Sequence, residues 1–160
     1  MSMPLLRRCW MLCLLALGVI SAYGQAVAPA ACPWLTQGTA ARVLGGDVSV
    51  DVHVSEAGEG TCSFVRGTDA QTLLRIEVSK SMLPGCGADA KELRGIGNEA
   101  LRCTLPAEGN HAVEKISGRV RDRYFTLTKR YRSTSEARGP ADTQDDALEQ
   151  AAESVAGNLF

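Results

Sequence analysis

The feature that most constrains this chain is its N-terminus. Two arginines precede an almost unbroken apolar stretch over residues 10–22, and small residues follow that stretch. This order is typical of a secretory signal peptide, and the stretch is shorter than the roughly 20 residues that span a bilayer. We therefore predict that residues 1–24 are a signal peptide, with cleavage after Gly24 or Ala26. An uncleaved membrane anchor is the alternative.

Cysteine usage agrees with export. Of the six cysteines, those outside the predicted signal are Cys32, Cys62, Cys86 and Cys103. An even number of cysteines in an exported chain predicts two disulfides, although the sequence leaves the pairing open. We prefer Cys32–Cys62 with Cys86–Cys103, because each bond then closes a loop of moderate length. A zinc site built from the four cysteines is disfavoured because no C-x-x-C pair is present, and lipidation of Cys32 stays open.

Composition and charge limit the partners that we expect. The chain is 45% hydrophobic and 22% charged, as in ordinary folded proteins, and its formal net charge is −1. Loss of two arginines with the signal makes the mature chain more acidic, so we expect no nucleic-acid partner. No later apolar stretch reaches spanning length, so we expect no transmembrane span after cleavage. Residues 25–31 are expected to form a flexible leader, and residues 32–160 a single disulfide-stabilised domain.

Hydrophobic periodicity predicts both helices and strands. The clearest strand covers residues 47–55, in which valine alternates with polar residues. Capping residues and apolar stripes predict helices over residues 37–44, over residues 89–94, and over an amphipathic C-terminal stretch capped by Asp142 or Asp145. The other strands are expected at residues 61–66, 72–79, 101–105, 112–120 and 124–131. We therefore predict an α+β fold, in which an antiparallel sheet of about five to six strands packs against helices on one face.

Residues 95–100 match the G-x-G-x-x-A pattern of dinucleotide-binding proteins. That pattern binds a pyrophosphate where a strand precedes it and a helix follows it. Here a helix is expected before the pattern and a cysteine-bearing strand after it. We therefore predict a tight turn at this position, and we expect no cofactor.

One face of the first predicted strand carries Ser49, Asp51 and His53. These residue types occur in catalytic triads, but alternate residues of one strand lie about 6–7 Å apart, and a triad needs hydrogen-bond contact between its members. No nucleophile-elbow motif is present. A solvated polar strand face is the preferred interpretation, and a hydrolase that uses His53 and Asp51 is the alternative.

Residues 115–132 are strongly basic. They include seven lysines and arginines but one acidic residue, whereas residues 133–160 include one arginine and six acidic residues. Loose pairing between this predicted hairpin and the acidic final helix is the structural explanation. The functional interpretation is a surface for an anionic envelope component or protein. To that surface we assign Arg119, Arg121, Arg123, Lys129 and Arg130.

Four short motifs follow one another in a recognisable order. They cover residues 32–36, 41–45, 62–64 and 93–100. In this order they resemble small exported bacterial α+β proteins of unknown function, related in layout to actinobacterial lipoproteins and to domains of PsbP-like architecture. The resemblance spans residues 32–159 and implies a fold, but it brings no catalytic residues.

Together these observations favour a periplasmic or secreted, non-enzymatic domain that binds an envelope component or a protein partner. The first alternative is a small exported hydrolase that uses His53 and Asp51. The second is a structural or inhibitory module.

Overall fold

The computed structural model describes residues 31–67, 72–87, 90–132 and 141–160. The predicted signal, residues 1–24, lies outside these ranges, as does nearly all of the predicted leader. Within the described residues the chain forms two helices and seven strands. In chain order these are α1 (Gln37–Leu44), β1 (Val48–Val54), β2 (Gly60–Arg66), β3 (Leu73–Ser79), β4 (Lys91–Leu93), β5 (Glu99–Glu108), β6 (His111–Val120), β7 (Arg123–Arg132) and α2 (Ala141–Asn158).

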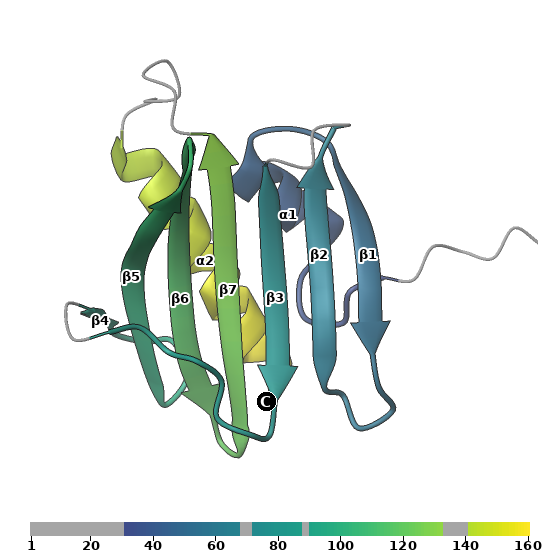
Figure 1. The fold of residues 1–160 in the computed structure, drawn as a ribbon. Helices are drawn as coiled ribbons and strands as arrows, with labels where there is room; N and C mark the ends of the chain where they lie inside the picture. The colour runs from purple at the N-terminus through teal and green to yellow at the C-terminus, as the bar shows by residue number, and fades with distance from the viewer. Residues whose placement is uncertain (1–30, 68–71, 88–89, 133–140) are drawn as a thin grey trace, which may run out of the picture.

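The seven strands form one antiparallel sheet with the order β1-β2-β3-β7-β6-β5-β4. The pairing of β3 with β7 joins the first three strands of the chain to the last four in one sheet. Figure 1 shows both helices behind the sheet, and the opposite side, here called the open face, turned toward the viewer. The prediction of an α+β fold with an antiparallel sheet and helices on one face is confirmed.

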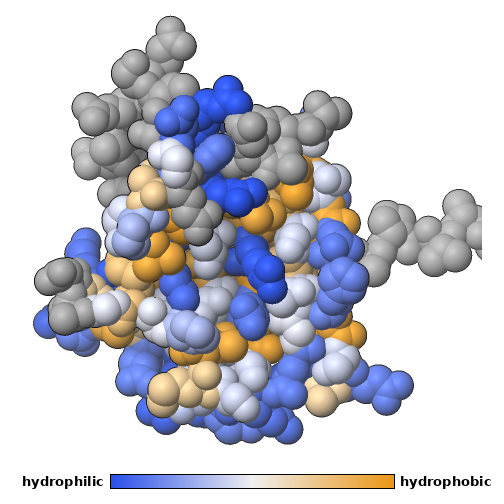
Figure 2. Space-filling view, in the orientation of Figure 1, coloured by the Kyte–Doolittle hydropathy of each residue, from blue (hydrophilic) through white to orange (hydrophobic). Residues whose placement is uncertain are grey.

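The alternation of apolar and polar residues decides which face each strand side chain occupies, because neighbouring strand residues point to opposite faces. On the helix side, the register aligns Val50 with Phe64 and Phe64 with Leu74. On the open face, Asp51 lies opposite Ser63. Figure 2 views the open face, on which hydrophilic and apolar residues are interspersed.

α1 begins and ends as the sequence chemistry requires. The side chain of Thr36 caps α1 by accepting a hydrogen bond of 3.2 Å from the Thr39 backbone N–H. Gly45 ends this helix with a φ of 72°, a left-handed conformation that suits glycine. The core lies between the helices and the sheet, and its largest fully buried side chains include Phe64, Leu74, Ile76, Ile116, Phe125, Leu127, Leu148 and Val155.

The predicted helix over residues 89–94 is wrong. Lys91–Leu93 form strand β4, which pairs with β5 through Leu93 opposite Ala100. Leu93 is buried at 7% exposure, so pairing and burial override the local capping pattern. With β4 the sheet has seven strands, which is more than the five to six predicted.

Two predicted boundaries also change. β5 extends to Glu108, and Pro106 lies within the register shift between Leu105 and Glu108, where a bulge lets a strand accept proline. The final helix begins at Ala141, so Asp142 and Asp145 lie inside the helix and do not precede it.

Two disulfides brace the fold, and they are the same pairs that the sequence analysis prefers. Cys32 is bonded to Cys62, and Cys86 is bonded to Cys103. Cys62 is fully buried on the helix side, where Cys32 packs against the core. Cys103 belongs to the open face. It pairs with Lys115, which directly precedes the buried Ile116 in β6 and therefore points to the opposite side of the sheet.

Candidate functional site

A segment without helix or strand crosses the open face. It covers residues 81–87, here called the crossing segment, and runs in front of β7, β6 and β5 on its way from β3 toward β4 (Figure 1). Beyond a local hydrogen bond from the Ser81 backbone N–H to Ser79 Oγ at the end of β3, two side-chain links hold it to the sheet: the Cys86–Cys103 disulfide and a hydrogen bond from Lys115 Nζ to the Pro84 carbonyl. The crossing segment therefore stands over the sheet as a separate layer.

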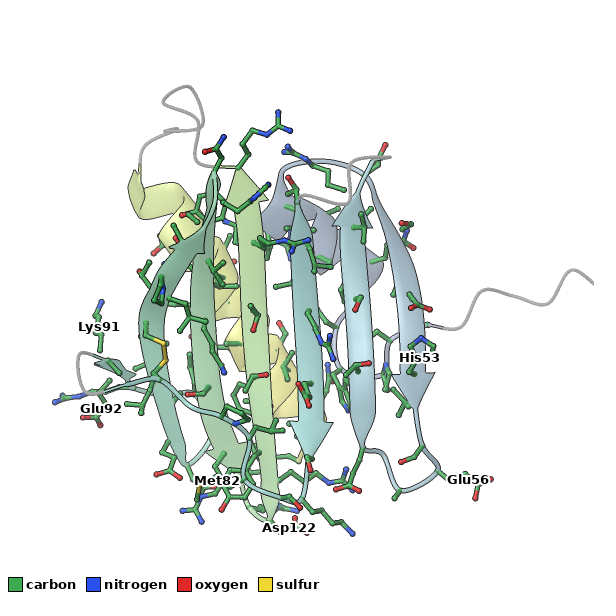
Figure 3. All side chains as sticks on the ribbon, in the orientation of Figure 1. His53, Glu56, Met82, Lys91, Glu92 and Asp122 are labelled. Atoms are coloured by element: carbon green, nitrogen blue, oxygen red, sulfur yellow. A yellow bond between two sulfur atoms is a disulfide. The ribbon has the colours of Figure 1, made fainter. Side chains whose placement is uncertain are left out.

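A groove of about 540 Å³ lies between the crossing segment and the sheet. Its size falls in the range of about 300–1,000 Å³ that small-molecule sites occupy. Most of the surface that lines it is apolar, and the exposed or partly exposed apolar residues of this lining are Met82, Leu83, Leu101 and Tyr124. Figure 3 shows Met82 in front of the lower part of the sheet and Glu92 beside the β4 edge. Both residues line the groove.

Arg119 is the one cationic side chain among the residues that line the groove. Its Nε atom lies 2.9 Å from Glu99 Oε1, and the two side chains are 41% and 62% exposed. Nε is buried and its N–H is not aimed at that oxygen closely enough to form a hydrogen bond. The contact of Arg119 with Glu99 is made through Nε, and the Arg119 side chain is 41% exposed and lines the groove.

Lys115 holds the crossing segment at an energetic cost. Burial lowers the pKa of the Lys115 ammonium below its ordinary value of 10.5, and the nearby Glu77 carboxylate opposes this shift in part. A depressed lysine pKa means that the folded state disfavours the charged form. The hydrogen bond to Pro84 therefore recovers part of the cost of desolvating the ammonium.

The five residues that we assigned to an anion-binding surface do not share one surface. Arg119 and Arg130 lie on the open face. Arg121 occupies the turn between β6 and β7 and lies over the Phe160 ring, with 5.1 Å from Cζ to the ring centre. Arg123 donates to the carbonyls of Gly58 and Ala57, at 2.6 and 3.0 Å, and so supports the turn between β1 and β2.

Lys129 lies on the helix side, where it is 3% exposed and 5.0 Å from the centre of the Tyr131 ring. The Tyr131 hydroxyl donates to Glu114 at 2.8 Å, and Glu114 pairs with Arg102 at 3.3 Å. Arg102 in turn pairs with Glu149 of α2 at 3.0 Å. Arg102 belongs to β5 and not to the basic hairpin, so this ion pair is not the pairing of hairpin and helix that the sequence suggested.

His53 and Asp51 do contact each other, contrary to the distance argument made from the strand repeat. His53 Nε2 lies 3.0 Å from Asp51 Oδ2, because the two side chains lean toward each other on the edge strand β1. Both are strongly exposed, at 74% and 70%. Figure 3 places His53 at the opposite side of the sheet from Glu92, so this pair lies apart from the groove.

The first four residues of the G-x-G-x-x-A stretch, 95–98, lie in the connection between β4 and β5, and its last two, Glu99 and Ala100, begin β5. Gly95 and Gly97 adopt φ values of 84° and 62°. A Cβ atom at Gly97 would lie 2.6 Å from the Arg119 carbonyl oxygen, so close backbone approach explains this glycine. The predicted tight turn is therefore present.

Sequence reasoning missed most of the groove. Its apolar lining could not be predicted, because the residues come from three distant parts of the chain: Met82 with Leu83, Leu101, and Tyr124. The available signal was the preferred Cys86–Cys103 pairing, which requires the segment around Cys86 to lie against the strand that carries Cys103.

Comparison with protein-family models, curated proteins and solved structures finds no match to this chain. Neither described helix is both long and apolar enough to cross a membrane. Within the described ranges, no group of three or more histidine, cysteine or acidic side chains is arranged to hold a metal ion.

Proposed function

We propose that this protein is an exported, non-enzymatic binding domain, and that the groove beneath the crossing segment is its ligand site. The ligand class that fits is a small envelope amphiphile with an apolar body and one anionic group. The observation that carries this proposal is the apolar lining of the groove with the partly exposed Arg119 side chain beside it. The site uses one residue of the basic hairpin and the adjoining sheet face.

The apolar part of the ligand would rest against side chains such as Leu101, Leu83 and Tyr124. Leu101 is 38% exposed and Met82 is 78% exposed, so covering them removes apolar surface from water. The anionic group would accept hydrogen bonds from the planar guanidinium of Arg119, whose geometry suits carboxylate and phosphate. Glu99 is already paired with Arg119, which limits the repulsion that its carboxylate exerts on an anion.

Binding of two matched probes tests the ligand class. We expect dodecanoate to bind more tightly than dodecyltrimethylammonium, because the two share an alkyl chain and differ in the sign of their head group. Arg119→Gln should weaken dodecanoate binding by at least about tenfold, as expected for a charge-assisted hydrogen bond, and should leave the cationic probe within about twofold. Isothermal titration calorimetry on the mature protein measures both affinities.

Arg75→Gln is the matched control, since Arg75 is an exposed arginine that lies on the open face and does not line the groove. It should leave both affinities unchanged. Leu101→Gln should weaken both probes, because it replaces part of the apolar lining with an uncharged polar amide. Preference for the cationic probe, or equal losses in Arg119→Gln and Arg75→Gln, would contradict the proposal.

Two features support export. The order of residues at the N-terminus is typical of a signal peptide, and disulfides persist in oxidising compartments such as the periplasm. The intact mass of protein recovered from the periplasm or the medium, before and after reduction and alkylation, tests this. We expect a mass that lacks residues 1–24 or 1–26 and no free thiol before reduction. Full-length protein with reduced cysteines would contradict it.

A further inference from the structure

The two disulfides of this protein occupy very different surroundings. Cys32–Cys62 belongs to the helix side, where Cys62 is 0% exposed, and Cys32 packs against the core but is itself partly exposed. Cys86–Cys103 joins the crossing segment to β5 on the open face, and both of its cysteines are partly exposed. Because access to sulfur controls the rate of thiol–disulfide exchange, a reductant should reach the second bond first.

The crossing segment has few other attachments. Among the described residues, no backbone hydrogen bond joins residues 82–87 to a strand of the sheet. The hydrogen bond from Lys115 to Pro84 is the other polar side-chain link, and the lowered pKa of Lys115 shows that burial offsets part of its benefit. The covalent bond is therefore the main restraint on this segment.

We propose that the Cys86–Cys103 disulfide is a redox latch, whose reduction by a dithiol releases residues 81–87 from the sheet and opens the groove. One thiolate of the dithiol attacks a sulfur of the bond, forms a mixed disulfide and expels the other cysteine as a thiolate. The second thiol of the reductant then resolves the mixed disulfide. Both protein sulfurs end as thiols, and the dithiol is oxidised to its own disulfide by the same two electrons.

Release of the crossing segment leaves the core intact. The residues that this segment contributes to the groove, such as Met82 and Leu83, are absent from the buried core, whereas Cys62 is part of it. The consequence for ligand binding rests on the proposed function, because the opened groove loses one wall. The release itself requires no ligand and can be measured without one.

Graded reduction of the native mature protein tests the latch. Dithiothreitol is added, free thiols are trapped with N-ethylmaleimide, and labelled peptides are measured by mass spectrometry. We expect Cys86 and Cys103 to be labelled together, at least about tenfold faster than Cys32 and Cys62. Hydrogen exchange of the selectively reduced protein should rise in residues 81–87 and stay unchanged in β6 and β7. Equal reduction rates, or unchanged exchange in residues 81–87, would overturn the proposal.

Two variants separate the latch from the second link. Cys86→Ser with Cys103→Ser should reproduce the fast exchange of residues 81–87 without any reductant. Lys115→Met removes the hydrogen bond to Pro84 but keeps the disulfide, and should leave that exchange within about twofold of the wild type. If Lys115→Met releases the segment as fully as the cysteine variant, the disulfide is not the latch. Failure of dodecanoate to bind would contradict the proposed function and leave this result standing.

Discussion

Replacing Gly60 with alanine is expected to lower the free energy of unfolding by about 3–5 kcal/mol, because strain and overpacking act together. Gly60 begins β2 with a φ of 144°, which side chains rarely adopt. A Cβ atom there would lie 2.0 Å from the His53 carbonyl oxygen and 2.9 Å from the Val54 Cα. Both are backbone atoms, so β1 itself would have to move. Urea denaturation monitored by circular dichroism measures the loss.

Gly67→Ala provides the control for backbone strain alone. Gly67 also has a positive φ, 60°, but a Cβ atom there would meet nothing within 4 Å. We expect this change to cost about 1–2 kcal/mol, the penalty for a left-handed residue. Equal losses at Gly60 and Gly67 would show that the close approach to His53 does not matter.

Gly118→Ala is expected to lower the free energy of unfolding by about 2–4 kcal/mol through steric conflict in the core. Gly118 lies opposite Phe125 in the pairing of β6 with β7. A Cβ atom at Gly118 would lie 2.6 Å from Phe125 Cζ and 2.7 Å from Cε1. The fully buried phenylalanine ring therefore occupies the space that the glycine leaves empty.

A double-mutant cycle with Phe125→Leu tests this packing. The smaller side chain leaves room near Gly118, so Gly118→Ala should cost less in that background, with a coupling energy of at least about 1 kcal/mol. Gly38→Ala in α1 is the control, because it meets nothing within 4 Å and should stabilise the protein by about 0.5–1 kcal/mol. Additive effects of the two substitutions in β6 and β7 would refute the assigned contact.

Elements governed by local patterns could be predicted from the sequence. The bounds of α1 follow from the cap at Thr36 and the glycine at position 45, and both act within one turn of the helix. β1 follows from the alternation of valine with polar residues, since one face of an antiparallel sheet is buried. These signals depend on neighbouring residues alone.

Elements governed by distant partners could not be predicted from the sequence. The residues of β4 have a local helix signal, but they form a strand because Leu93 pairs with Ala100 of β5 and is buried there. The basic hairpin illustrates the same limit for the site. Lys129 and Arg130 are adjacent in sequence, yet strand geometry sends them to opposite faces of the sheet.

The pairing of the cysteines has a consequence for how the molecule matures. The four cysteines within the described residues pair in chain order, first with second and third with fourth. A polypeptide threaded N-terminus first into an oxidising space presents its thiols in that same sequence. If this chain is exported as we propose, oxidation in order of arrival yields the native connectivity without later reshuffling.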